Sequence, residues 1–274
     1  MRIDAHQHFW KFNPVRDEWI DDSMTAIRRD FYPENLEVEL VANGMAGSIA
    51  VQSDQSISEN EFHLELAQKH QFIRGVVGWV DFQAADISEQ LARYKGTPMK
   101  GFRHVLQGEQ QRDFMLRPAF MKGIAELAAF GYTFDILIYP DQLAYAKQFV
   151  KAFPDQPFVI DHLAKPLIRD KKIDVWKNDI LAFSRYENVF CKISGMVTEA
   201  QWVGWKNQDF TPYIETVVES FGVNRLMFGS DWPVCLVAAR YAEVVDIVTQ
   251  YFSTFSRIEQ EAIFGGTAIR FYNL

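Results

Sequence analysis

The sequence predicts an α/β fold: one (β/α)8 barrel of the TIM type, with eight parallel strands that alternate with helices. Three observations favour it. Eight short β-rich runs are separated by amphipathic stretches, several runs are apolar on both faces, and 274 residues is a usual length for such a barrel. The expected strands are Arg2–Phe9, Gly47–Gln52, Ile73–Val80, Gly101–Leu106, Thr133–Ile138, Phe158–His162, Val189–Ser194 and Leu226–Asp231.

Helical patterns fill the intervals between these strands. Gly131 and Pro154 follow two of them, and both residue types end helices, while Ser58 precedes a third and is expected to cap it. The expected helices are Glu59–His70, Phe114–Phe130, Asp141–Phe153, Val175–Arg185, Pro212–Phe221 and Ala239–Phe252.

The domain organisation follows from the absence of any linker. No Pro/Gly/Ser-rich stretch, charge block or short repeat interrupts the chain, so we expect a single domain over residues 1–274. The segment Lys11–Glu37 has no clear periodicity, and we expect it to lie over the barrel mouth as an insertion after the first strand.

Composition excludes several classes of function. The formal net charge of −8 provides no basic surface for nucleic acid or an anionic membrane. Cys191 and Cys235 are expected to be buried thiols of a reducing compartment. With no secretory signal and no apolar run of membrane-spanning length, we expect a soluble cytoplasmic protein. Phosphate-binding loops and the G-x-S-x-G elbow are also absent, which argues against a nucleotide cofactor and a serine nucleophile.

The first strand carries an H-x-H pair, His6-Gln7-His8. Because side chains alternate along a strand, His6 and His8 are expected to point the same way, where they could bind a metal ion or a polar substrate. Four of the six histidines lie at strand ends, whereas His63 and His70 fall within a helical pattern and are expected on the surface.

Asp231 lies at the end of the last strand, before Trp232-Pro233. In a closed barrel the last strand lies next to the first, so this carboxylate is expected beside the H-x-H pair. There it would act as a general base or as a metal ligand.

Strands four and six also end in reactive side chains. Arg103 suits a carboxylate or a developing oxyanion, and since His104 is adjacent, only one of the two is expected to point inward. His162 could polarise a carbonyl or shuttle a proton. Asp161 is expected to face the helices, and Lys165 to be a loop charge.

Three tryptophans lie near strand ends. Aromatic rings there could wall a pocket for the substrate, although tryptophan is also common in large cores. Besides His6 and His8, the candidate substrate-binding residues are therefore Trp10, Trp79 and Trp232.

Together these segments resemble the amidohydrolase superfamily, and within it the amidohydrolase-2 branch that contains sugar lactonases. The resemblance covers nearly the whole chain, and its specificity lies in the ordered combination of short motifs. It is carried by Asp4–Trp10, Trp19-Ile20, Glu59–Glu61, Leu64–Ala67, Gly101–His104, Asp161–Pro166, Lys192–Gly195, Phe228–Pro233 and Gly266–Tyr272, where Thr267 replaces the usual asparagine.

The resemblance implies a distorted (β/α)8 barrel of the amidohydrolase type that activates water at its mouth. His6, His8 and Asp231 match positions that bind one or two divalent metals in many members, and His162 matches the histidine of the sixth strand. However, the fifth strand has no histidine, and Arg103-His104 replaces a bridging ligand of the fourth. Two alternatives stay open: one zinc-like ion on His6, His8 and Asp231, or hydrolysis without a metal.

The expected activity is hydrolysis of the carboxylic ester of a sugar lactone, such as L-fucono- or L-rhamnonolactone. Asp231 would accept a proton from water, while Arg103, His162 and His104 would stabilise the oxyanion. Two other functions stay open, namely hydrolysis of a carboxylated lactone or non-oxidative decarboxylation on the same barrel, and a non-catalytic barrel that binds a sugar acid. The sequence carries no indication of oligomeric state.

Overall fold

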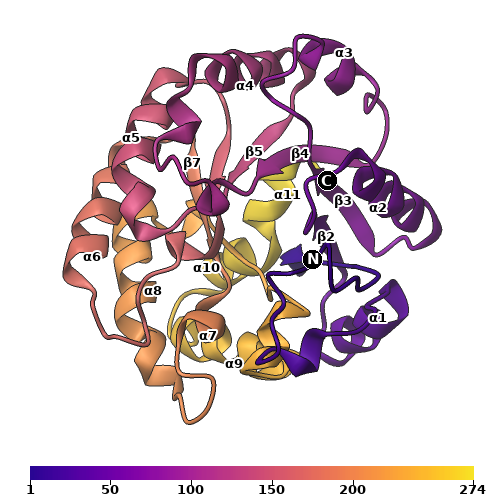
Figure 1. Ribbon diagram of the computed structural model, residues 1–274. Helices are drawn as coiled ribbons and strands as arrows, with labels where there is room; N and C mark the ends of the chain where they lie inside the picture. The colour runs from indigo at the N-terminus through magenta and orange to yellow at the C-terminus, as the bar shows by residue number, and fades with distance from the viewer.

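The computed structural model describes all 274 residues and shows eight parallel strands arranged as a barrel inside a ring of helices (Figure 1). The strand order follows the chain from first to last, and the bridge between Gln7 and Trp232 brings the two ends together. The expected (β/α)8 barrel is confirmed. Its strands are β1 Ile3–Gln7, β2 Gly47–Val51, β3 Ile73–Gly78, β4 Met99–His104, β5 Thr133–Ile136, β6 Phe158–Ile160, β7 Val189–Ile193 and β8 Leu226–Phe228.

Helices connect the strands and cover the outside of the barrel. Helix α2 is capped by the side chain of Ser56, not Ser58, which moves its start two residues earlier than expected. The helices are α1 Pro33–Ala42, α2 Ile57–Lys69, α3 Ile87–Ala92, α4 Pro118–Phe130, α5 Leu143–Ala152, α6 Asp174–Leu181, α7 Met196–Glu199, α8 Asn207–Phe221, α9 Tyr241–Phe252, α10 Arg257–Glu261 and α11 Thr267–Tyr272.

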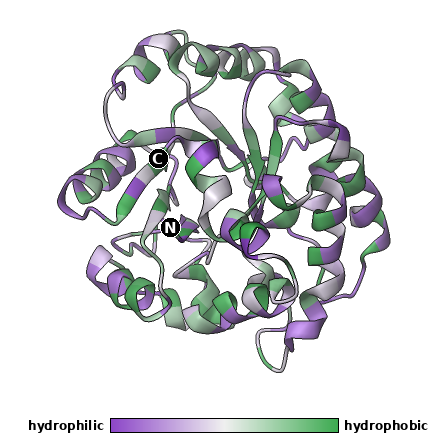
Figure 2. Cartoon of the chain, turned by 180° about the vertical axis from the view of Figure 1, so that it is seen from behind, coloured by the Kyte–Doolittle hydropathy of each residue, from purple (hydrophilic) through white to green (hydrophobic).

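The main core lies between the strands and the outer helices. Figure 2 shows hydrophobic and hydrophilic residues alternating along these helices. In α8 the buried side chains recur every three or four residues, as expected for a helix with one face on a sheet. They include Phe210, Tyr213, Ile214, Val217 and Phe221.

The surface expectation for His63 is wrong. The side chain is fully buried on the inner face of α2, and its Nε2 lies 3.1 Å from the carbonyl oxygen of Phe9. The helix is present as expected, but its inward face carries this polar residue. His70, at the end of α2, is partly exposed.

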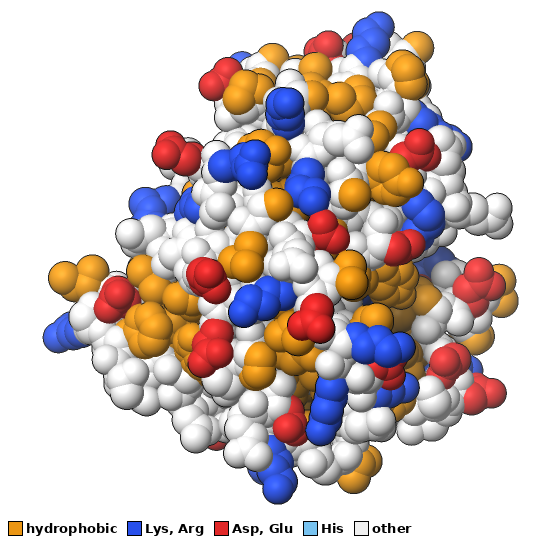
Figure 3. Space-filling model, turned by 90° about the vertical axis from the view of Figure 1, so that its left-hand side faces the viewer, with side chains coloured by type: hydrophobic (Ala, Val, Ile, Leu, Met, Phe, Trp, Pro, Cys, Tyr) orange, Lys and Arg blue, Asp and Glu red, His pale blue; other side chains and the backbone are white.

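The outer surface carries charges of both signs. Over α5, α6 and α8, Lys and Arg side chains are intermixed with Asp and Glu (Figure 3). None of the helices is long and apolar enough to cross a membrane.

The two ends of the barrel are sealed differently. At the amino-terminal end, α11 lies across the strands in the middle of the barrel (Figure 1), and its Tyr272 belongs to the same buried apolar cluster as Ile3 and Val77. The carboxyl ends of the strands remain accessible and carry the polar side chains that form the candidate site.

The seam between β1 and the segment after β8 depends on the buried carboxylate of Asp4. Its Oδ1 accepts hydrogen bonds from the backbone N–H groups of His6 and Ser230, at 3.1 and 2.9 Å. Its Oδ2 accepts from the hydroxyls of Ser230 and Tyr241, at 2.6 and 3.0 Å. Burial raises the pKa of Asp4 to about 6 although these hydrogen bonds lower it. One side chain therefore joins the first strand to the last.

We expect Asp4→Asn to lower the free energy of unfolding by about 2 kcal/mol, because the new amide places a donor against groups that already donate. Urea unfolding measures the change. The control is Asp22→Asn, whose side chain is 100% exposed, and which we expect to change stability by less than about 0.5 kcal/mol. Equal effects of the two substitutions would contradict this role of Asp4.

Candidate active site

Polar side chains converge on a cavity of about 340 Å³ at the carboxyl ends of the strands. They come from elements far apart in the sequence, because the parallel barrel brings all strand ends to one rim. Two aromatic side chains, Trp19 and Tyr139, also line the cavity and are partly exposed. The charged and imidazole side chains in its wall are His8, Arg103, His162, Lys165 and Asp231.

The H-x-H pair lies as strand alternation predicts. The rings of His6 and His8 meet edge to face, and their Nε2 atoms are 3.2 Å apart. The Nδ1 of His8 lies 2.7 Å from the carbonyl oxygen of Val51 on the neighbouring strand. His8 lines the cavity, whereas His6 is completely buried beneath it.

Asp231 lies against three imidazoles. Its Oδ1 is 3.4 Å from Nε2 of His8, 3.8 Å from Nε2 of His162 and 3.9 Å from Nε2 of His6. The backbone adopts φ +58° at this residue, and its N–H donates to the carbonyl of His6 at 2.8 Å. Burial raises the pKa of Asp231, but the influence of His162 and a hydrogen bond from His8 outweigh it and leave the pKa below its usual value.

The segment after β6 brings both Asp161 and His162 into the site. The expectation that Asp161 faces the helices is wrong, since its Oδ2 accepts from Nη1 of Arg103 at 3.0 Å inside the barrel. The strand ends at Ile160, and the backbone turns left-handed from His162 to Lys165, so the strand alternation no longer applies.

The ring of His162 is held from the side of β7. Its Nδ1 lies 2.8 Å from Oγ of Ser194. Gly195, at φ +65°, lies so close that a Cβ atom there would be 2.6 Å from the same nitrogen. Only glycine leaves space for the imidazole at this position.

Arg103, not His104, faces the cavity. The guanidinium is nearly buried, contacts the carbonyl oxygen of Gln52, and has one nitrogen, Nε, without a partner. His104 points to the helix side of β4, where Nε2 lies 2.7 Å from a carboxylate oxygen of Glu109 and the ring stacks on Phe114. The structure therefore does not place His104 among the oxyanion donors.

The three tryptophans expected to bind the substrate lie outside the cavity. Trp10 and Trp232 pack edge to face on Phe31, with ring centroids 5.5 and 5.2 Å away. Trp79 lies beside His104 on the helix side of β4. Proximity to a strand end did not distinguish these core residues from the aromatic side chains that do line the cavity, Trp19 and Tyr139.

A buried lysine that the sequence reasoning missed lies beneath the cavity. Lys192 of β7 is completely buried, and its Nζ is 2.5 Å from Oδ2 of Asp135 on β5 and 3.0 Å from Oδ1 of Asp161. The hydroxyl of Tyr272 donates to Asp135 from the opposite end of the barrel. A charged residue inside an otherwise apolar strand was the available signal.

Lys192 and its neighbours shift the pKa values of two site residues. Burial alone would raise the pKa of Asp161, but Lys192, His6 and Arg103 hold that carboxyl well below its usual range. Burial, with Lys192 as the next contribution, also lowers the pKa of His6 well below the ordinary value. Burial and Lys192 thus favour the neutral form of His6, and the neighbouring cations favour the ionised form of Asp161.

Two groups of side chains are close enough to share one divalent cation. The first is His6, His8 and Asp231, and the second is His6, Asp161 and His162, with ligand atoms in each group within 4.8 Å of one another. Two imidazoles and a carboxylate form a donor set that suits a zinc-like ion.

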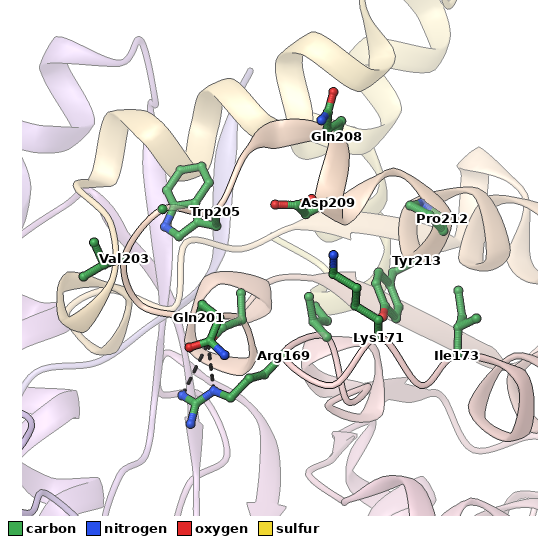
Figure 4. Close-up of a pocket in the computed structure, with 13 residues that line it drawn as sticks. Arg169, Lys171, Ile173, Gln201, Val203, Trp205, Gln208, Asp209, Pro212 and Tyr213 are labelled. Atoms are coloured by element: carbon green, nitrogen blue, oxygen red, sulfur yellow. Dashed lines mark hydrogen bonds between the residues drawn. The ribbon is translucent and has the colours of Figure 1, made fainter.

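A second hollow, of about 420 Å³, lies on the outside of the barrel beside α8 (Figure 4). Arg169 extends along it and donates to the carbonyl of Ala200, and Lys171, Trp205 and Asp209 lie around it. It contains none of the imidazoles or carboxylates of the strand ends. Of these two cavities, the one at the barrel mouth is therefore equipped for acid–base chemistry.

The barrel and the polar cluster at its mouth define a hydrolase-type barrel of the amidohydrolase class. A family model described as amidohydrolase matches residues 3–274. The chain belongs to this family, which confirms the resemblance deduced from its motifs.

Two curated relatives span the whole chain. An L-fucono-1,5-lactonase of Burkholderia multivorans is 38% identical over 100% of this chain and 96% of the relative. An L-fucono-1,5-lactonase of Burkholderia ambifaria is 33% identical with the same coverage. A crystal structure of an amidohydrolase from B. multivorans with bound zinc is 38% identical, with a TM-score of 0.96 over 100% of this chain and 99% of that one.

Proposed function

We propose that this protein is a carboxylic ester hydrolase that opens a sugar lactone, such as an L-fuconolactone, to the open-chain hydroxy acid. The observation that carries the proposal is a carboxylate, Asp231, that faces one small cavity together with His8, His162 and Arg103. The two full-length relatives named L-fucono-1,5-lactonase support the substrate class.

The cavity suits a small polyol ring. Its volume of about 340 Å³ lies at the lower end of the range of ligand pockets. Trp19 and Tyr139 offer flat apolar surfaces for the C–H face of a sugar ring, and Ser53, Gln107 and Lys165 offer polar atoms for its hydroxyls. This combination favours a neutral, hydroxylated lactone.

In the proposed reaction Asp231 accepts a proton from water while the water oxygen bonds to the lactone carbonyl carbon. The positive charge of Arg103 and the Nε2–H of His162 stabilise the resulting oxyanion, with the Ser194 hydroxyl donating to Nδ1 of that histidine. The bond between the carbonyl carbon and the ring oxygen then breaks. Asp231 returns the proton to the departing alkoxide, which completes the hydroxy acid.

His6, His8 and Asp231 would hold a divalent cation, which would supply Lewis-acid activation of water. The donor types of these three residues fit such an ion, but the surroundings of His6 do not fit it. The Nδ1 of His6 faces the positive ammonium of Lys192, and its Nε2 faces the positive guanidinium of Arg103. The proposed reaction therefore uses protein groups alone.

We expect Asp231→Asn to lower kcat/KM for L-fuconolactone by about 10³-fold, because the amide cannot accept the proton. Acid release measured with a pH indicator gives the rate, and circular dichroism monitors the fold. The control is Glu109→Gln, which changes the partner of His104 outside the cavity and should leave kcat/KM near wild type. An Asp231→Asn rate within about tenfold of wild type would contradict the role as base.

We expect Gly195→Ala to lower kcat/KM by about 10- to 100-fold, because its Cβ displaces the His162 ring. Gly131→Ala is the matched control: its φ of +70° imposes a similar backbone cost, but nothing lies within 4 Å of the added Cβ. Thermal unfolding should show destabilisation of both variants, at least as large for Gly195→Ala as for Gly131→Ala. If both also lost activity equally, the position of His162 would not be the cause.

We expect turnover to be unchanged after dialysis against a chelator and not to rise on addition of zinc, because protein groups supply each step. The same pH-indicator assay measures the rate, and elemental analysis verifies that metal has been removed. A rate that disappears with the metal and returns with zinc would overturn the metal-free mechanism.

A further inference from the structure

We propose that Glu59 fixes the hydroxyl of Ser53 as a hydrogen-bond acceptor toward the cavity, so that the site selects a lactone ring with a hydroxyl donor at that place. Ser53 lines the cavity, whereas Glu59 is buried on α2 outside the lining. Glu59 is therefore a positioning residue. The choice of a lactone rests on the proposed function, but the direction of the Ser53 hydroxyl does not.

The carboxylate of Glu59 holds the turn between β2 and α2. Glu59 lies in the first turn of α2, where a negative charge is favourable, and its side chain reaches back to the residues before the helix. Its Oε2 accepts from the backbone N–H groups of Ser53 and Asp54, at 3.0 and 2.6 Å. Its Oε1 accepts from the hydroxyl of Ser53 at 2.6 Å, a distance typical of a hydroxyl on a carboxylate.

These contacts determine the direction of the Ser53 hydroxyl. A serine hydroxyl has one hydrogen, and an ionised carboxylate can only accept. The hydrogen therefore lies on the line from Oγ to Oε1 of Glu59. The lone pairs of Oγ are left for the cavity that Ser53 lines. A ligand atom that forms a hydrogen bond with Ser53 must then be a donor.

A lactone ring has donors only in its hydroxyl groups, since the ring oxygen and the carbonyl oxygen only accept. In the proposed reaction the carbonyl oxygen is bound by Arg103 and His162, so Ser53 would contact a ring hydroxyl. A substituent that cannot donate, such as a keto group, a methoxy group or fluorine, would face the lone pairs of Oγ. Such an unpaired polar contact lowers affinity, and the site thereby distinguishes a hydroxyl from its substitutes.

The turn is also held from the side of β4. Gln52 precedes Ser53, and its carbonyl oxygen accepts from the guanidinium of Arg103. The side-chain amide of Gln52 donates to the backbone carbonyl of Arg103 at 3.3 Å. Ser53 thus has a fixed position relative to Arg103, which fixes where the selected hydroxyl lies relative to the lactone carbonyl.

The substitution Glu59→Gln should reverse the hydroxyl of Ser53. The two backbone N–H groups at Oε2 require an acceptor, so the amide oxygen takes that place. The NH2 group then faces Oγ of Ser53 and donates to it. The hydroxyl hydrogen must turn toward the cavity, where Ser53 becomes a donor. A ring hydroxyl can accept as well as donate, so it still binds.

Neutron diffraction from deuterated crystals of the ligand-free protein locates the deuterium of Ser53 directly. We expect it between Oγ and Oε1 of Glu59 in the wild-type protein, and on the cavity side of Oγ in Glu59→Gln. A wild-type deuterium that points into the cavity would overturn the proposal, and this result does not depend on the substrate.

The selection is measured by calorimetric binding of L-fucono-1,5-lactam, in which N–H replaces the ring oxygen, and of analogues in which fluorine replaces each ring hydroxyl in turn. Fluorine accepts weakly and cannot donate. We expect fluorine at one ring position to weaken binding to the wild-type protein about tenfold. In Glu59→Gln that loss should fall below about threefold, while the parent lactam binds within about threefold of wild type.

Ser53→Ala is a second variant that leaves the backbone N–H groups bonded to Glu59. It should weaken binding of the parent lactam about tenfold and that of the discriminating fluoro analogue by less than about threefold.

Glu259→Gln is the matched control, because Glu259 accepts from the backbone N–H and the hydroxyl of Ser256, at 2.9 and 2.6 Å, but lies outside the cavity. It should leave the effect of each fluorine unchanged. An equal fluorine effect in wild type and Glu59→Gln, or a lactam that does not bind, would overturn the proposal. None of these measurements uses turnover, so a failure of lactone hydrolysis appears separately in the acid-release assay.

Discussion

The site depends on three charged groups buried inside the barrel, the ammonium of Lys192 and the carboxylates of Asp135 and Asp161. Charged groups without water are tolerated only when they are paired and hydrogen-bonded. Strands β5 and β7 and the end of β6 supply the three groups, so these neighbouring elements must hold one register for the charges to meet. The network therefore links the sheet to the cavity above it.

The network of Lys192, Asp135 and Asp161 also positions the candidate catalytic residues above it. Lys192 and Arg103 approach Asp161 from two sides, and this fixes the guanidinium at the cavity wall. Lys192 also contacts His6, which in turn touches the ring of His8. Arg103 and His8 in the cavity wall are thus held by groups below them, which is the form of preorganisation that oxyanion stabilisation requires.

The sequence predicted the barrel and the meeting of the first and last strands, because hydrophobic periodicity and parallel topology determine both. It did not predict side chains that depend on local backbone or tertiary packing. Asp161 was misplaced because a left-handed turn follows β6, and the direction of Arg103 depended on register. Lys192 was overlooked because an isolated lysine shows its role only when partners from β5 and β6 are known.

Asp161 and Asp231 are both buried in the site, but their neighbours make them differ in how readily they accept a proton. Asp161 contacts both Lys192 and Arg103, which hold its pKa well below the usual range, so this carboxylate accepts a proton poorly. Asp231 contacts imidazoles instead, lines the cavity and remains 5% exposed. The better base is the carboxylate that can reach water and is not neutralised by a fixed cation. In the proposed reaction, the same residue type therefore orients the site at one position and takes the proton at the other.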